Sequence, residues 1–155
     1  MSWAKTAWLA LAAAVVGAQF VGYARTNPPV SSDVAAPPEV QKVLRRACFD
    51  CHSNQTEWPW YSAVAPLSWL LGRDVLEGRR RLNFSEWGEY ASDPETLVHK
   101  LRQITASVAN GSMAPWYYQV LHPSARLSGA DGALLVRWAE AESAHRPLFP
   151  DPMVR

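Results

Sequence analysis

Two cysteines and a histidine form the most chemically distinctive stretch of this 155-residue chain. Cys48 and Cys51 are its only cysteines, they are three residues apart, and His52 follows the second directly. A disulfide between them would close a very small loop and stabilise little. A thioredoxin-type pair would lie at the start of a helix after a strand, and a zinc site would need a fourth ligand at suitable spacing. The surrounding sequence favours neither.

The remaining interpretation uses all three residues together. Cysteines at positions i and i+3 form thioethers with the two vinyl groups of one haem, and the histidine that follows is the proximal ligand of the iron. We therefore predict one covalently attached c-type haem held by Cys48, Cys51 and His52. Attachment of this kind takes place on the outer side of the bacterial cytoplasmic membrane, so the chain is expected to be exported.

An apolar segment occupies the N-terminus. The eighteen residues from Ala7 to Ala24 contain one strongly polar residue, Gln19, and are flanked by Lys5 and Arg25. A helix of that length reaches about 27 Å, just enough to span a hydrocarbon core. We expect residues 1–25 to be a retained membrane anchor, with the rest of the chain on the periplasmic side. The alternative is a signal peptide cleaved near Ala24, which would leave a soluble periplasmic protein.

The chain after this segment is organised as helices. Apolar residues recur at spacings of three and four along several stretches, which is typical of amphipathic helices, and no stretch shows a convincing period of two. The predicted helices cover residues 38–47, 67–81, a stretch that follows Pro94 and includes Leu97 to Val108, and 129–144.

These patterns divide the chain into four parts. Residues 26–37, rich in Pro, Ser and Ala, are predicted to be a tether between the N-terminal segment and the domain. Residues 38–150 are predicted to form one small all-α domain, and residues 151–155 a tail.

The formal net charge is only +1, and nucleic-acid binding normally needs a clustered basic face. No nucleic-acid partner is therefore expected.

Longer stretches around the cysteines resemble the bacterial haem-binding domain family. The resemblance rests on ACFDCHSNQTEWPWYSAVAPLSWLLGRDVLEGRRRLNFSEW, on MAPWYYQVLHPSARLS and on a terminal LLVRWAEA. Members of the family are small exported single-haem cytochromes c. The order of parts is also similar to that of class I cytochromes c, which implies a class I-like helical domain around the haem.

The resemblance also indicates a ligand for the sixth position of the iron. Met113, in the loop GSMAPW before the last helix, resembles the ligand loop of class I cytochromes. A thioether sulfur favours low-spin iron and raises the reduction potential, as expected of an electron carrier. The alternatives are His99, His122 and an open site.

Further haem contacts are expected from a proline and an aromatic residue. In class I cytochromes a proline carbonyl accepts the N–H of the proximal imidazole; Pro66 is the candidate here and Pro59 the competitor. Among the many aromatic residues, Trp60 is predicted to contact the haem. Asp50, inside the motif, is predicted to be a solvent-facing spacer. The run Arg79 to Arg81 is predicted to be a solvated helix end, and the alternative is that it pairs with the haem propionates or with an acidic docking partner.

Two functions of different classes fit these features. The preferred hypothesis is a monomeric, membrane-tethered electron-transfer cytochrome with a redox partner protein that the sequence does not identify. The alternative is a haem-based gas sensor or peroxidase-like enzyme with an open or displaceable distal site. His99 and Arg102 lie three apart on one predicted helix and could supply the acid–base pair that a peroxidase needs.

Overall fold

The structure is a computed structural model that describes residues 2–145. Within this range it contains eight α-helices and two short 3-10 helices, and it has no strand beyond one isolated bridge between Ser32 and Glu86. The predicted all-α class is therefore confirmed for the part of the chain that is described. The predicted tail, residues 151–155, lies outside it.

All four of the helices predicted for the domain are present. Pro38 and Pro94 are the first residues of two of them. Asp93 also accepts hydrogen bonds from the first turn of the helix that starts at Pro94, and Ser128 with Asp131 forms a capping box on the last helix. Their bounds are α2 (Pro38–Ala47), α4 (Leu67–Arg81), α6 (Pro94–Ala109) and α8 (Gly129–Ala144).

Five shorter elements were not predicted. They have three to six residues each, which is too short for an apolar period to be recognised against the surrounding loops. They are α3 (Phe49–His52), η1 (Trp60–Ala63), α5 (Trp87–Ala91), α7 (Trp116–Leu121) and η2 (Pro123–Ala125).

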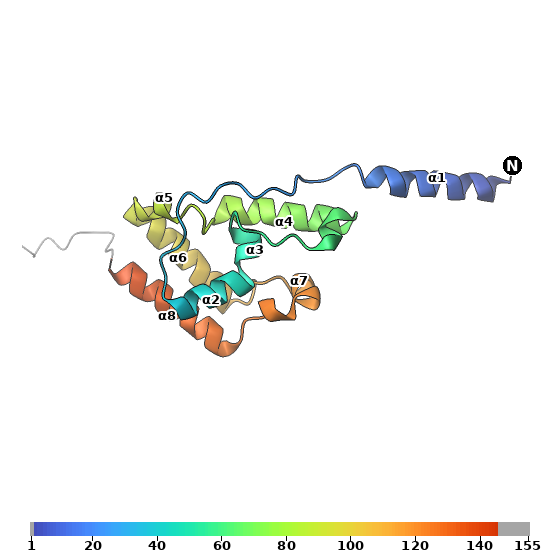
Figure 1. Cartoon of the computed structure of the whole chain (residues 1–155). Helices are drawn as coiled ribbons and strands as arrows, with labels where there is room; N and C mark the ends of the chain where they lie inside the picture. The colour runs from blue at the N-terminus through green and yellow to red at the C-terminus, as the bar shows by residue number, and fades with distance from the viewer. Residues whose placement is uncertain (1, 146–155) are drawn as a thin grey trace, which may run out of the picture.

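The hydrophobic core lies between α2, α5, α6 and α8 (Figure 1). Aromatic rings run through it: Phe49 stacks on Phe84 with ring centroids 5.3 Å apart, Phe84 stacks on Trp87, and Trp87 lies 5.9 Å from Trp138. Offset contacts of this kind contribute about 0.5–1.5 kcal/mol each beyond the area that they bury. The core thus joins the predicted haem-attachment turn, which contains Phe49, to the C-terminal helix.

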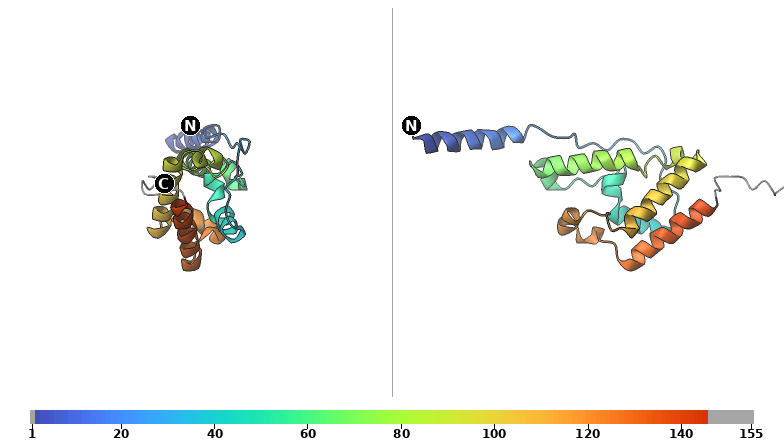
Figure 2. Two further views of the ribbon diagram at one scale, coloured as in Figure 1. Left: turned by 90° about the vertical axis from the view of Figure 1, so that its left-hand side faces the viewer. Right: turned by 180° about the vertical axis from the view of Figure 1, so that it is seen from behind.

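The N-terminal helix extends away from the domain (Figure 1, Figure 2). α1 (Trp3–Ala18) buries none of its residues and ends at Ala18, six residues before the end of the apolar run. The expectation of one continuous helix from Ala7 to Ala24 is therefore wrong. No helix within residues 2–145 combines the length and the apolarity needed to span a membrane.

The segment predicted to be a tether is instead packed on the domain. The Asn54 side chain donates to the Pro29 carbonyl at 2.9 Å, the Ser31 N–H donates to the Ser85 carbonyl at 3.0 Å, and Val34 is buried in the core. Asp33 forms an ion pair with Arg45 at 2.6 Å. The folded unit therefore begins well before Pro38, because a low-periodicity segment can still pair its backbone with loops elsewhere in the chain.

Candidate functional site

The two cysteines and the histidine lie on one turn of helix. α2 runs directly into α3, because the Cys48 N–H donates to the Leu44 carbonyl at 2.8 Å and the His52 N–H donates to the Cys48 carbonyl at 2.9 Å. Residues three and four apart on a helix share a face, so this turn presents Cys48, Cys51 and His52 together. Burial raises the pKa of each cysteine to about 12, so both are protonated thiols at neutral pH.

A glycine allows this turn to approach α4 closely. A Cβ atom at Gly78 would lie 2.3 Å from the carbonyl oxygen of Cys51. That distance is far inside van der Waals contact, so the packing requires a residue without a side chain. The turn is thereby held against the rigid surface of α4.

One ring nitrogen of His52 is held by the backbone. Nδ1 lies 3.0 Å from the carbonyl oxygen of Leu82. A carbonyl oxygen only accepts, so Nδ1 carries the proton and Nε2 is the nitrogen left to bind a metal. Burial lowers the pKa of His52, which keeps the imidazole neutral at pH 7. A neutral ring oriented by a carbonyl is the form in which histidine ligates metal ions.

The carbonyl predicted for this role, that of Pro66, is not the one that the structure uses. Pro66 immediately precedes α4, whereas Leu82 immediately follows it. The two ends of a 15-residue helix are about 22 Å apart, so Pro66 does not reach His52. Pro59, the competitor, precedes η1 and is not the partner either.

Buried polar groups lock the His52 loop to the segment that follows α4. The Phe84 N–H donates to the His52 carbonyl at 2.7 Å. The Asn54 N–H donates to the Ser85 hydroxyl at 2.9 Å, and the Asn83 side chain donates to that of Asn54 at 3.0 Å. Because a buried polar group is costly when unpaired, these bonds fix one arrangement of the two segments. Sequence analysis missed Leu82, Asn83 and Ser85; their only signal is the LNFS stretch directly after a helix, in which apolar and polar residues alternate.

Two adjoining cavities open beside the turn. Their volumes are about 270 Å³ and about 420 Å³. The residues that line both are Ala47, Cys48, His52, Arg81 and Met113. His52 and the predicted methionine therefore border the same space, which we call the cleft.

The cleft is apolar in one part and charged in the other. The smaller cavity has an apolar wall formed by Leu82, Phe84, Ile104, Val108, Leu127 and Leu135. The larger cavity has charged residues on its border, namely Asp50, Arg73, Asp74, Glu77 and Arg81. A haem has an apolar macrocycle and two anionic propionates, so the two parts of the cleft fit its chemistry. Arg73 and Arg81 are the residues able to pair with the propionates.

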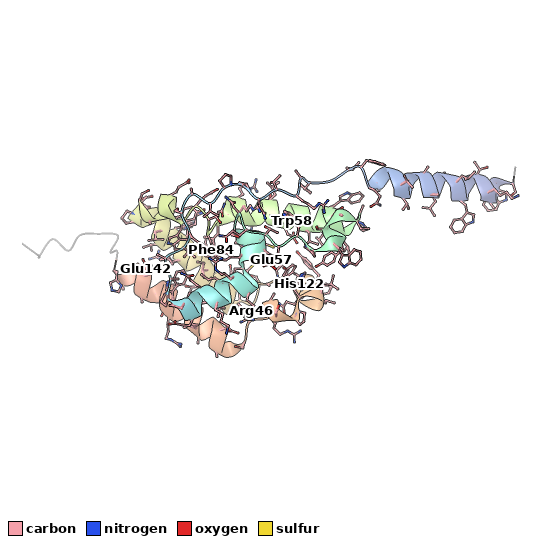
Figure 3. The ribbon with its side chains drawn as sticks, viewed as in Figure 1. Arg46, Glu57, Trp58, Phe84, His122 and Glu142 are labelled. Carbon is pink, nitrogen blue, oxygen red and sulfur yellow. The ribbon has the colours of Figure 1, made fainter. Side chains whose placement is uncertain are left out.

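Of the candidate distal ligands, only Met113 lies at the cleft. It is half-buried in the turn between α6 and α7. His122 stacks on Tyr118 with ring centroids 4.0 Å apart and lines a different cavity. Figure 3 shows His122 and Phe84 on opposite sides of α3. His99 is exposed on α6, so neither histidine borders the space next to His52.

The predicted contact of Trp60 with the haem has no counterpart in the structure. Trp60 is exposed on η1 and borders neither part of the cleft. The aromatic residues that do border it are Phe84, Tyr117 and Tyr118.

Asp50 connects three segments rather than facing solvent as a spacer. Its carboxylate accepts the Glu57 N–H at 2.9 Å and the Tyr118 hydroxyl at 2.6 Å. Its backbone carbonyl accepts the Thr56 hydroxyl at 2.7 Å. Through the bond to Tyr118, the turn that carries Cys48, Cys51 and His52 is tied to α7, which directly follows the Met113 turn.

The arginine run at the end of α4 contains residues with different roles. Arg79 donates to the carbonyls of Ser53 at 2.7 Å and Thr26 at 2.9 Å and to the Thr56 hydroxyl at 2.9 Å. It therefore joins the N-terminal segment to the loop after His52 and is not a solvated helix end. Arg80 is exposed and pairs with Glu77 on its own helix, as expected for such an end.

Comparison with protein families agrees with this site. The model of the haem-binding domain family matches residues 13–141, which is most of the chain. The chain belongs to this family and binds haem. Comparison with curated proteins and with solved structures gave no significant match. The matched range includes the whole cleft and also residues 26–37, in agreement with their packing on the domain.

Proposed function

We propose that this protein is an exported electron-transfer cytochrome whose haem is covalently attached through Cys48 and Cys51, with His52 and Met113 as the iron ligands. The observation that carries the proposal is that Met113 lines the same two cavities as Cys48 and His52. His99 and Arg102, the pair that a peroxidase would need, are both exposed and border neither cavity. A catalytic distal site has no comparable support.

The residues of the cleft are suited to a carrier of single electrons. When bound, the haem supplies reversible one-electron chemistry at its iron. The Leu82 carbonyl fixes the orientation of the His52 ring and increases the basicity of Nε2. A thioether from Met113 raises the reduction potential, and the apolar wall keeps water away from the site.

Location and architecture are parts of the same proposal. Export is supported by the apolar run that starts at Ala7, by Lys5 as the basic residue before that run, and by the chemistry of the Cys48–His52 motif. We place the domain at the periplasmic face of the cytoplasmic membrane, as a monomer that exchanges electrons with a redox partner protein. The contact of α8 with α2 supports a class I-like arrangement, in which the last helix packs against the one that leads into the haem motif.

The axial ligands are tested by an optical spectrum with and without CO. The wild-type protein, produced with c-type maturation, should show a ferric methionine-to-iron charge-transfer band and no response to CO. Met113→Ala should lose the band and bind CO promptly, because removal of the sulfur opens the sixth position. Met153→Ala, which changes the methionine of the tail, is the matched control and should behave as wild type. A wild-type protein that is high-spin and binds CO at once would overturn the electron-carrier proposal.

Covalent attachment and processing are tested by mass. After denaturation, wild-type protein should retain one haem, whereas Cys48→Ser combined with Cys51→Ser should release any haem that it binds. The mass of the mature N-terminus distinguishes a retained segment from cleavage near Ala24. Release of haem from the wild-type protein would contradict thioether attachment.

A further inference from the structure

One end of the domain has an unusual lack of charge. Residues 58–72 and 112–121 contain no Asp, Glu, Lys or Arg, although charged residues make up 19% of the whole chain. The first stretch forms η1 and the start of α4, and the second includes α7. These elements meet around a small cavity lined by Tyr61, Leu67 and Leu121 among others, so two charge-free segments far apart in sequence lie side by side.

Large apolar side chains at this end face outward. Trp60 is 80% exposed, Trp116 76%, Val120 69% and Leu121 55%. Val64 and Leu67 are exposed beside them. We call these six residues the apolar end. Exposed apolar residues that occur singly need no explanation, but a group that includes two tryptophans and lacks charge indicates a surface that binds something.

The N-terminal helix leaves the domain at this same end (Figure 1, Figure 2). The Ala65 N–H donates to the Gln19 side chain at 2.9 Å, and the Trp69 indole N–H donates to the Val21 carbonyl. Tyr23 lies directly over Gly72, where a Cβ would meet its side chain at 2.5 Å. The base of α1 is thus docked on the start of α4, and the mostly apolar surface of this helix, in which no residue is buried, continues that of the domain.

We propose that the apolar end binds a lipid bilayer surface together with α1, so that the domain has a fixed orientation on the membrane. Tryptophan side chains are favoured at membrane interfaces, where the ring is apolar and the indole N–H stays hydrated. Continuity with the apolar helix selects lipid over a second protein as the occupant, because α1 needs the same environment. The inference rests on the membrane location in the proposed function and adds a contact made by the folded domain itself.

The haem cleft lies next to this surface. The residues that border both the larger part of the cleft and the small cavity at the apolar end are Cys51, Asp74, Pro115, Tyr117 and Tyr118. A domain oriented in this way holds its haem site close to the lipid headgroups. It would therefore exchange electrons with a partner whose redox centre lies near the bilayer surface.

The test uses the haem-loaded full chain and vesicles of phosphatidylcholine with phosphatidylglycerol. Trp60→Ser, Trp116→Ser and Val120→Ser in combination should weaken vesicle binding by about tenfold or more, because each removes apolar area from the contact. Leu76→Ser is the matched control: Leu76 is 54% exposed, but nine residues after Leu67 it lies on the opposite face of α4. The control should bind within about twofold of wild type.

The outcomes separate this inference from the proposals on which it rests. Equal vesicle binding by wild type and the triple variant, with intact haem spectra, would overturn the role of the apolar end and leave α1 as the membrane contact. Wild-type protein that does not bind vesicles at all would overturn both membrane proposals but not the axial ligands, which the spectrum reports. Sedimentation without vesicles is measured in parallel. A dimer that the triple variant abolishes, with vesicle binding unchanged, would assign the apolar end to a second copy of the chain.

Discussion

The segment that carries His52 and the segment that carries Met113 line one cleft but are held by different kinds of contact. Around His52, the Leu82 carbonyl, the Phe84 N–H and the buried amides of Asn54 and Asn83 form a continuous hydrogen-bonded network. These groups come from the loop after α3 and the segment after α4, and the close approach of those elements leaves little freedom for the His52 side chain.

The Met113 turn is held by fewer and more exposed bonds. It begins at Gly111, whose φ of +68° ends α6 in a conformation that favours glycine. The Ser112 N–H donates to the exposed Asn110 side chain, and Ala114 is the buried residue of the turn. The difference teaches that His52 is part of the folding core, whereas Met113 can be disturbed without unfolding the domain. The variants below test this contrast, from the largest expected effect to the smallest.

Gly78→Ala should be the most damaging change. The new methyl group meets the Cys51 carbonyl, so α3 must move away from α4, at a cost of about 3 kcal/mol in the free energy of unfolding. The yield of covalent haem should fall as well. Gly129→Ala is the control, because a Cβ there meets nothing within 4 Å. Denaturant unfolding measures both, and a Gly78→Ala protein of wild-type stability would contradict the packing described here.

Asn83→Ala should destabilise the His52 side of the cleft, because it removes buried hydrogen bonds. It leaves the Asn54 side-chain oxygen and the Ser85 N–H without their partners, which costs about 2 kcal/mol. Asn110→Ala, the equivalent change at the exposed Met113 turn, should cost about 0.5 kcal/mol or less. Thermal unfolding of the two variants compares the sides directly. Equal losses would mean that both ligands are held with similar rigidity.

Tyr118→Phe should affect the distal side more than the fold. It removes the hydrogen bond to Asp50, at a cost of about 1 kcal/mol, and loosens the link between the haem-attachment turn and α7. The methionine-to-iron band should weaken and slow CO binding should appear. Tyr117→Phe, which loses a bond to Asp74 on α4 instead, is the matched control. A Tyr118→Phe spectrum that matches the control would show that this link does not position Met113.

Asp131→Asn should have the smallest effect and should leave the spectrum unchanged. Hydrogen bonds from Ser128 and the ion pair with Arg46 lower the pKa of Asp131 below its usual value of 3.8. A lowered folded-state pKa means that the carboxylate stabilises the fold above about pH 5, and that this contribution is lost as the pH falls through the folded-state value. The variant should therefore lose about 0.5–1 kcal/mol at pH 7, and this loss should shrink as the pH falls through the folded-state pKa of Asp131. A loss that does not depend on pH would assign the effect to packing.

The sequence by itself determined the features that depend on neighbouring residues. The spacing of Cys48, Cys51 and His52 places them on one helical turn because the period of the helix is local. The same reasoning located α2, α4, α6 and α8, whose apolar faces repeat over ten or more residues. Met113 was found as a candidate from its loop, and the structure brings it to the cleft.

Only the tertiary structure decided the contacts between distant segments. The acceptor for His52 lies 30 residues away at Leu82, and the partner of Asp50 lies 68 residues away at Tyr118. The structure also places Pro66 and Trp60 away from the cleft that they were predicted to border, because order along the chain does not reveal which carbonyl or ring reaches the cleft. Such contacts depend on how all of the helices pack, and the packing of residues 26–37 on the domain shows the same dependence.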